Sequence, residues 1–132
     1  MWHVHAYHQT GSSVICNPPV VDTDIDYVIF VYRSSFEEHI KIKLLNSGWK
    51  LCGNEAYDDQ DNTFISYRKG KLNYIFVFYQ GDYDRWEAAM LLAKDRNLVS
   101  KQDRINLFRT ILAGTKKKTA GNATYFDLTP SP

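Results

Sequence analysis

Residues 25–32 read Ile-Asp-Tyr-Val-Ile-Phe-Val-Tyr, a run of β-branched and aromatic residues whose only charge is Asp26, near its start. Such a run is typical of a strand that is covered on both faces. We therefore expect this strand at the centre of a sheet. The fold class that follows is α/β (α+β), with a mixed β-sheet and helices packed on it.

Four further segments of the chain are expected to be strands. Residues 2–7 alternate apolar and polar side chains, as in a short edge strand with Trp2, Val4 and Ala6 on its buried face. Residues 49–52 predict a short strand. Residues 63–68 and 72–79 predict two more, and Lys69-Gly70-Lys71 between them has the length and chemistry of a hairpin turn.

One helix is expected after the central strand. Ser35 and Glu38 form a capping box, and Gly48 is the expected stop. The apolar positions between them have helical spacing and predict that the helix packs on the sheet. These positions are Phe36, Ile40 and Leu44.

Two helices are expected near the end of the chain. Asp82 is the expected cap of a helix over residues 83–96, and Ser100 with Asp103 the expected start of another that Gly114 closes. The predicted buried residues of the first are Trp86, Met90 and Ala93, and those of the second are Ile105, Phe108 and Ile111.

The chain has 132 residues, which predicts one domain over residues 1–114, followed by a partly mobile tail over residues 115–132. The net charge of +1 gives no overall field toward nucleic acid or membrane. Because the apolar runs are too short to span a bilayer and the start does not resemble a signal peptide, we expect a cytoplasmic protein without membrane contact. Cys16 and Cys52 lack metal-site spacing and are expected to be reduced and packed.

Asp24 and Asp26 stand at the head of the central strand. Side chains alternate along a strand, so the two carboxylates point the same way. Carboxylates this close repel each other unless a cation neutralises them, and hard oxygen ligands suit Mg²⁺ or Mn²⁺. Taken alone, the pair is explained more simply by a strand that emerges from the acidic turn Asp22-Thr23-Asp24.

The segment Gly11-Ser12-Ser13 precedes this pair and changes the interpretation. Glycine lets the backbone approach a phosphate closely, and serine hydroxyls with adjacent N–H groups can hold phosphates beside the ion. We interpret the two features as one metal and nucleotide site, with Asp24 and Asp26 as metal ligands.

This combination resembles the nucleotidyltransferase superfamily (the DNA polymerase β-like fold), in which a Gly-Ser turn precedes a loop and then an Asp-x-Asp strand start. Here the motif reads Gly11-Ser12, a loop, and then Thr23-Asp24-Ile25-Asp26. The resemblance covers roughly residues 2–114 and is greatest to the short nucleotidyltransferase-like proteins of tailed bacteriophages. It implies the minimal nucleotidyltransferase-like fold and a viral protein located in the host cell cytoplasm.

The resemblance implies transfer of a nucleoside monophosphate from an NTP to an unknown hydroxyl acceptor, in RNA or a host protein. Asp24 and Asp26 would hold Mg²⁺ (or Mn²⁺), while Ser12 and Ser13 would contact the phosphates. The chain departs from the family at the third carboxylate position, where Asn73 stands; an amide ligates weakly and is no useful base. Glu55 is a possible substitute.

The alternative is a catalytically inactive nucleotidyltransferase-like module that binds a nucleotide or a host protein. A third interpretation is a structural or interaction protein whose acidic loop from Glu55 to Asp61, within residues 53–62, is the contact surface. The chain also departs from the family after the Gly-Ser turn, where the usual Gly-Ser-x-Ala-Arg-Gly continuation is absent.

Other polar residues have simpler explanations beside a functional one. A zinc or nickel site on His3, His5 and His8 is conceivable, but a polar strand face is favoured. The hairpin cations Arg68, Lys69 and Lys71 fit an acceptor nucleic acid and a solvated turn equally well. Basic residues of the last two helices are more simply surface charges than phosphate ligands: Lys94, Arg96, Lys101, Arg104 and Arg109.

Overall fold

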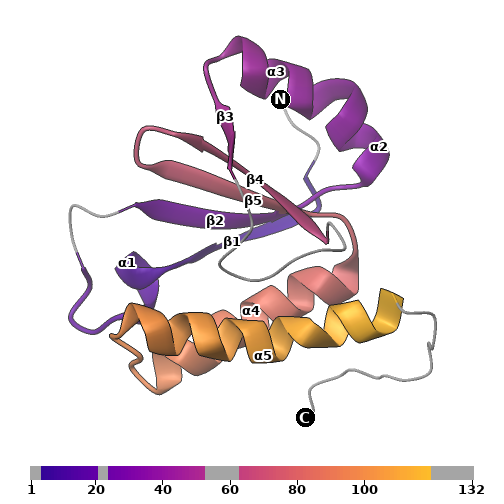
Figure 1. Ribbon diagram of the computed structural model, residues 1–132. Helices are drawn as coiled ribbons and strands as arrows, with labels where there is room; N and C mark the ends of the chain where they lie inside the picture. Colours follow the sequence, from indigo (N-terminus) through magenta and orange to yellow (C-terminus); the bar gives the residue numbers. More distant parts are fainter. Residues whose placement is uncertain (1–3, 21–23, 53–62, 120–132) are drawn as a thin grey trace.

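The computed structural model describes residues 4–20, 24–52 and 63–119 of the chain. It confirms the predicted fold class, because a five-stranded mixed sheet carries helices on both faces (Figure 1). The strands are β1 (Ala6–Thr10), β2 (Ile25–Phe30), β3 (Lys50–Cys52), β4 (Phe64–Lys69) and β5 (Leu72–Val77). The helices are α1 (Ser12–Ile15), α2 (Arg33–Ser35), η1 (Phe36–Ile40), α3 (Lys41–Asn46), α4 (Gln80–Asp95) and α5 (Lys101–Thr119).

The strand order is β1-β2-β5-β4-β3, with β2 and β5 parallel and the other pairs antiparallel. The strand predicted at residues 25–32 is therefore an interior one, but β5 and not β2 is the central strand. The end of β2 is buried on both faces, as its composition predicted, since Val28, Ile29 and Phe30 are at most 7% exposed.

The predicted edge strand exists, but it lies later in the chain than expected. Pairing with β2 begins where the His5 amide donates to the Phe30 carbonyl, and β1 continues to Thr10. Val4 precedes the strand and is 37% exposed, and Trp2 lies outside the described residues. The inward-facing positions after Ala6 are polar. A prediction based on alternating apolar residues therefore placed the end of the strand too early.

The helix after β2 begins two residues before the predicted capping box. Its N-cap is Tyr32, and Ser35 has helical backbone angles with no side-chain capping bond, so the prediction of a cap at Ser35 is wrong. The predicted stop is confirmed: α3 ends at Asn46, and Gly48 follows with a φ of 87°. The predicted packing residues are all about 1% exposed or less: Phe36, Ile40 and Leu44.

The middle of this helix is a π-helical turn, η1. An α-helix has 3.6 residues per turn, so apolar residues spaced by four drift around its surface. The wider π turn, with its i→i+5 hydrogen bonds, reduces that drift. It keeps Phe36, Ile40 and Leu44 in one buried stripe against the sheet.

The hairpin between β4 and β5 is confirmed. Lys69 pairs with Leu72, which leaves a two-residue turn whose first residue, Gly70, has a φ of 59°. The short strand predicted at residues 49–52 is β3. The acidic loop of residues 53–62, with Glu55, lies outside the described residues.

The helix predicted at residues 83–96 begins earlier, as α4. Its N-cap is Tyr79, and Asp82 lies inside the first turn, where a carboxylate also favours the positive end of the helix dipole. Asp82 is therefore not the cap. Its predicted core residues are confirmed as buried: Trp86, Met90 and Ala93.

The start of α5 is confirmed, because the Ser100 hydroxyl accepts the backbone N–H of Asp103 at 3.3 Å. Phe108 is buried, whereas Ile105 and Ile111 are only partly so. Gly114 does not end the helix, which continues to Thr119. A single glycine costs a helix only about 1 kcal/mol, and lysine is a good helix former. Residues 120–132 of the predicted tail lie outside the described residues.

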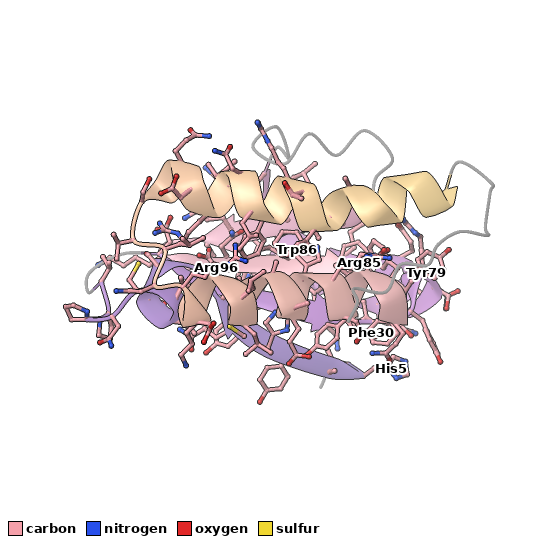
Figure 2. The ribbon with its side chains drawn as sticks, turned by 90° about the horizontal axis from the view of Figure 1, so that it is seen from below. His5, Phe30, Tyr79, Arg85, Trp86 and Arg96 are labelled. Atoms are coloured by element: carbon pink, nitrogen blue, oxygen red, sulfur yellow. The ribbon has the colours of Figure 1, made fainter. Side chains whose placement is uncertain are left out.

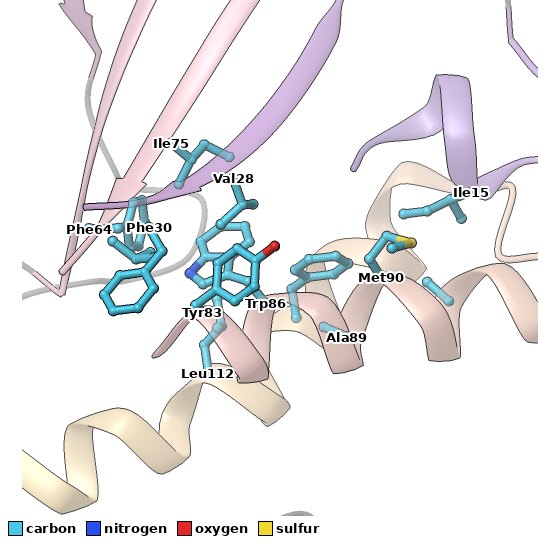
Figure 3. Packing of buried hydrophobic residues seen from close by; sticks show 13 residues of the cluster. Ile15, Val28, Phe30, Phe64, Ile75, Tyr83, Trp86, Ala89, Met90 and Leu112 are labelled. Carbon is cyan, nitrogen blue, oxygen red and sulfur yellow. The ribbon is translucent and has the colours of Figure 1, made fainter. Parts of the chain in front are cut away.

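The core has two layers, one on each face of the sheet. Figure 1 shows the helices that cover the two faces, and Figure 2 shows the lower pair from below. The upper layer in Figure 1 lies under α2, η1 and α3. The lower layer packs against α4 and α5, with Trp86 as its largest fully buried side chain. Figure 3 shows Trp86 among side chains from the sheet and from the helices, and its ring centroid lies 5.1 Å from Phe64 and 5.6 Å from Phe108. No helix among the described residues combines the length and the apolarity that a membrane span needs.

Candidate functional site

The chain turns sharply at Gly11, between β1 and α1. Gly11 has φ 86° and ψ −177°, a conformation that is essentially restricted to glycine. A Cβ built on Gly11 would overlap Oδ2 of Asp26. The turn therefore lies directly against the Asp26 carboxylate, and a side chain at position 11 would separate the two. The predicted association of the Gly-Ser turn with this aspartate is a close contact in the fold.

Asp26 and Asn73 are neighbours on the parallel strands β2 and β5. The Asn73 Nδ2 group donates a hydrogen bond to Asp26 Oδ1 at 3.0 Å. Burial raises the pKa of Asp26 above its ordinary value, and the hydrogen bond from Asn73 opposes this rise. The negative charge of Asp24 adds to the rise, whereas the positive charges of Arg68 and Arg104 oppose it.

Asp24 stands just before β2 and is 49% exposed. Its Oδ2 forms an ion pair with Arg68 Nη1 at 2.8 Å, and this bond is the main cause of a raised Arg68 pKa. Asp24 and Asp26 are close enough for the charge of one to act on the other. A cation bound by both carboxylates would have to share Asp24 with Arg68 or displace Arg68 from it.

The two predicted serines differ in their surroundings. Ser12 follows Gly11 directly, as the first residue of α1. The Ser13 hydroxyl accepts a hydrogen bond from Gln9 Nε2 at 3.1 Å, so it is directed to β1 and not to Asp26. The site as it stands therefore brings together Gly11, Asp26 and Asn73, with Ser12 beside them.

A small cavity of about 50 Å³ lies between this end of the sheet and the helices. Its polar wall includes Thr10, Asp26 and Arg104, and its apolar wall consists of Ile15, Ile75, Trp86 and Phe108. A volume of this order holds a few water molecules and no nucleotide. A nucleotide would therefore have to lie outside the cavity, over the Gly11 turn and Asp24.

Several polar atoms on this face of the sheet are buried without a hydrogen-bond partner among the described residues. They are Thr10 Oγ1, Asn73 Oδ1 and both ring nitrogens of His8. Burial lowers the pKa of His8 to about 4, so this imidazole is neutral at neutral pH. The unpartnered Asn73 oxygen is an acceptor suited to water or a hard cation next to Asp26.

The donor set fits a divalent cation in a limited way. Two carboxylates and one amide oxygen are hard ligands of the kind that Mg²⁺ takes. No cluster of three or more His, Cys, Asp or Glu side chains with metal-binding geometry occurs in residues 4–20, 24–52 and 63–119. Asn73 thus occupies the position where a third carboxylate would complete the set, and Glu55 lies outside the described residues.

The histidines do not support the alternative zinc or nickel site. The His5 ring packs on Phe30 and Tyr32, at centroid distances of 5.0 and 4.1 Å. The His8 ring instead meets the ring of Tyr83, a residue of the lower core layer, edge to face at 5.0 Å. His3 lies outside the described residues. His8 is thus partly buried, with both ring nitrogens inaccessible, and does not lie on an exposed polar strand face.

Arg104 is a member of this site that sequence reasoning assigned to the helix surface. Its Nη1 group donates to the carbonyls of Leu98 and Val99 at 3.1 and 2.8 Å, and lies 3.4 Å from Cys16 Sγ. These bonds hold the guanidinium beside the cavity, where its charge acts on Asp26. Helical spacing places Arg104 on the same side as Phe108, and this signal was available in the sequence.

Comparisons of the chain with protein-family models, with curated proteins and with solved structures found no match. The interpretation of the site therefore rests on its own residues and geometry.

Proposed function

We propose that the chain is a metal-dependent nucleotidyltransferase of phage type, which moves a nucleoside monophosphate from an NTP to a hydroxyl acceptor in RNA or protein. The observation that carries the proposal is the contact between the Gly11 turn and the Asp26 carboxylate. A glycine with no room for a side chain, next to a partly buried aspartate, is the arrangement that close approach of a phosphate and its cation needs.

The residues of the site have separate roles in this proposal. Asp24, Asp26 and the unpartnered Asn73 oxygen would hold Mg²⁺ or Mn²⁺, and the Gly11–Ser12 turn would contact the phosphates. When bound, the ion supplies positive charge at the phosphoryl oxygens. When the cation binds, the ion pair between Arg68 and Asp24 breaks and the Arg68 guanidinium contacts the phosphates. Arg104 stays beside Asp26.

A second candidate function is supported by the state of the carboxylates. Asn73 donates an N–H to Asp26 and supplies no negative charge, while Arg68 neutralises Asp24. Without a third carboxylate, the attacking hydroxyl has no obvious base. This favours a module that binds a metal–nucleotide complex or a host protein without turnover.

The first experiment measures pyrophosphate release from each of the four NTPs with Mg²⁺ or Mn²⁺, with RNA and a cell lysate as acceptors. In the double variant Asp24→Asn, Asp26→Asn, turnover should fall by about a thousandfold, because a catalytic cation contributes several kcal/mol to the transition state. Asp95→Asn, an exposed carboxylate near the end of α4, is the matched control and should retain full turnover.

The variant Asn73→Asp distinguishes the two candidates. If the missing carboxylate limits the reaction, this change should raise turnover by about tenfold or more. If the wild type shows no turnover but NTP with Mg²⁺ raises its melting temperature by a few degrees, the binding module is correct. Absence of both turnover and thermal stabilisation with every NTP would contradict both candidates.

A further inference from the structure

The helices of the described residues cover only part of the face of the sheet opposite the cavity. In Figure 1, α2 and α3 lie above the end of the sheet where β2 finishes, and none of the drawn helices lies above the end with the β4–β5 hairpin. Side chains of alternate strand residues emerge from this uncovered end. Tyr27, the neighbour of Asp26 in sequence, is one of them.

Four aromatic rings form a continuous row across this face of the sheet. Tyr7 of β1 lies 6.2 Å from Tyr27 of β2, and Tyr27 lies 6.1 Å from Tyr74 of β5, both edge to face. Tyr74 in turn stacks on Trp49 at 4.4 Å and 28°. We call these four residues the aromatic row.

The aromatic row is accessible. Tyr7 is 65% exposed, as is Leu51 of β3 on the same face, and the other three rings are partly exposed. Exposed aromatic rings on a sheet are the surfaces on which unpaired bases stack in single-strand binding proteins. Solvent-exposed rings in a contiguous row also cost solubility, which favours a functional explanation.

The described strands place positive charge beside the row. On this face, the residues of the five described strands include no carboxylate, and Lys69 is the single charged side chain among them. Its Cε lies 4.0 Å from a Cβ built on Gly48, the residue before Trp49, so its stem lies beside the row. Lys71, in the hairpin turn, is exposed at the same end.

We propose that the aromatic row, with Lys69 and Lys71, binds single-stranded nucleic acid. Bases stack on the rings of Tyr7, Tyr27 and Trp49, and the two lysines contact the phosphates. Lys69 and Lys71 thereby have a role that the proposed metal site does not give them. This binding does not depend on the proposed transfer reaction, because Tyr27 and Asp26 project from opposite faces of β2.

The test is fluorescence anisotropy with labelled oligouridine and oligothymidine of about 12 nucleotides and a duplex of equal length, in EDTA and without NTP. Tyr7→Ala should weaken single-strand binding by about tenfold, since one stacked base contributes on that order. Lys69→Gln should lower the slope of log affinity against log salt by about 0.7. Tyr27→Leu, which keeps an apolar side chain on the core, tests the partly buried ring.

The matched controls are Tyr79→Ala and Lys94→Gln. Tyr79 is 66% exposed, much like Tyr7, but follows β5 at the end of the sheet away from the hairpin (Figure 2). Lys94 is exposed on α4, on the other face. Weaker binding in the row variants and unchanged binding in the controls would support the proposal, and the RNA and DNA strands would show which sugar is preferred.

Three results would overturn the proposal: no single-strand binding by the wild type at low salt, equal binding of duplex, or equal losses in row and control variants. A dimer that Tyr7→Ala dissociates, with no nucleic-acid binding, would assign the surface to a second copy of the chain. The Asp24→Asn, Asp26→Asn variant should bind single strands like the wild type, so failure of the transfer reaction and failure of this proposal are separate results.

Discussion

Gly11 is the residue at which backbone conformation and the site meet. Gly11→Ala should lower the free energy of unfolding by about 2 kcal/mol or more, because its φ of 86° is strained for alanine and the new Cβ would overlap Asp26 Oδ2. Urea denaturation measures the loss. Gly70→Ala is the control: its φ is also positive, but nothing lies within 4 Å of an added Cβ, so about 1 kcal/mol is expected. Equal losses would show that the carboxylate contact contributes nothing.

The ionised Asp26 carboxylate should lower the free energy of unfolding at neutral pH. Burial raises its folded pKa above the unfolded value, so the native state binds the proton more tightly. Stability is then highest below the unfolded pKa and falls as pH rises through the folded pKa. Asp26→Asn should therefore raise the free energy of unfolding at pH 7, and this gain should shrink toward pH 4 as the native carboxyl takes up its proton.

Urea denaturation of both proteins between pH 4 and pH 7.5, without divalent cations, measures this difference. Asp95→Asn, which removes an exposed carboxylate, should show no comparable gain. A stability gain that is constant with pH would contradict the raised pKa and indicate a packing effect instead. A stabilising substitution at a site residue is what a functional, incompletely neutralised carboxylate predicts.

At the scale of elements, the sequence predicted which segments form strands and helices better than where they begin. β4, the hairpin and β5 followed from period-two alternation and a Gly turn, signals that lie within the segment itself. The starts of α2 and α4 did not follow. Ser35 and Asp82 have side chains that can cap a helix. In both cases, however, the helix begins earlier in the sequence, after the extended residues Tyr32 and Tyr79. A cap depends on where tertiary packing starts the helix, and the local pattern does not contain that information.

The same contrast applies to the candidate site. The sequence predicted that Gly11 and Asp26 belong together, and their contact agrees. It did not predict the ion pair between Asp24 and Arg68 or the position of Arg104, because both require the strand order and the docking of α5. Thr10 was also missed, since an inward-facing polar residue ends an apolar pattern. The metal and the nucleotide themselves remain predictions.

The whole molecule is one sheet with a core layer on each face, and its stability should be shared between them. Phe36 is a fully buried aromatic residue of the upper layer, with ring contacts to Phe76 and Phe78 at 5.0 and 5.5 Å. Phe36→Ala should lower the free energy of unfolding by about 3–5 kcal/mol. Leu45→Ala, at a 52% exposed position a few residues along in α3, should change it by less than about 0.5 kcal/mol.

Two tryptophans report on the two layers separately, since Trp49 packs against the upper cluster and Trp86 belongs to the lower one. The test uses two Phe36→Ala variants, one that retains only Trp49 and one that retains only Trp86, with the other tryptophans changed to Phe. The unfolding midpoints of the two variants should shift to lower urea concentration by the same amount. Val28, Ile29 and Phe30 alternate between the layers along β2, so neither layer can lose its order without exposing the other face of that strand. A Trp49 transition that precedes the Trp86 transition would show instead that α2, η1 and α3 unfold as an independent unit. The proposed metal site, with Asp26 on the lower face, would then not depend on them.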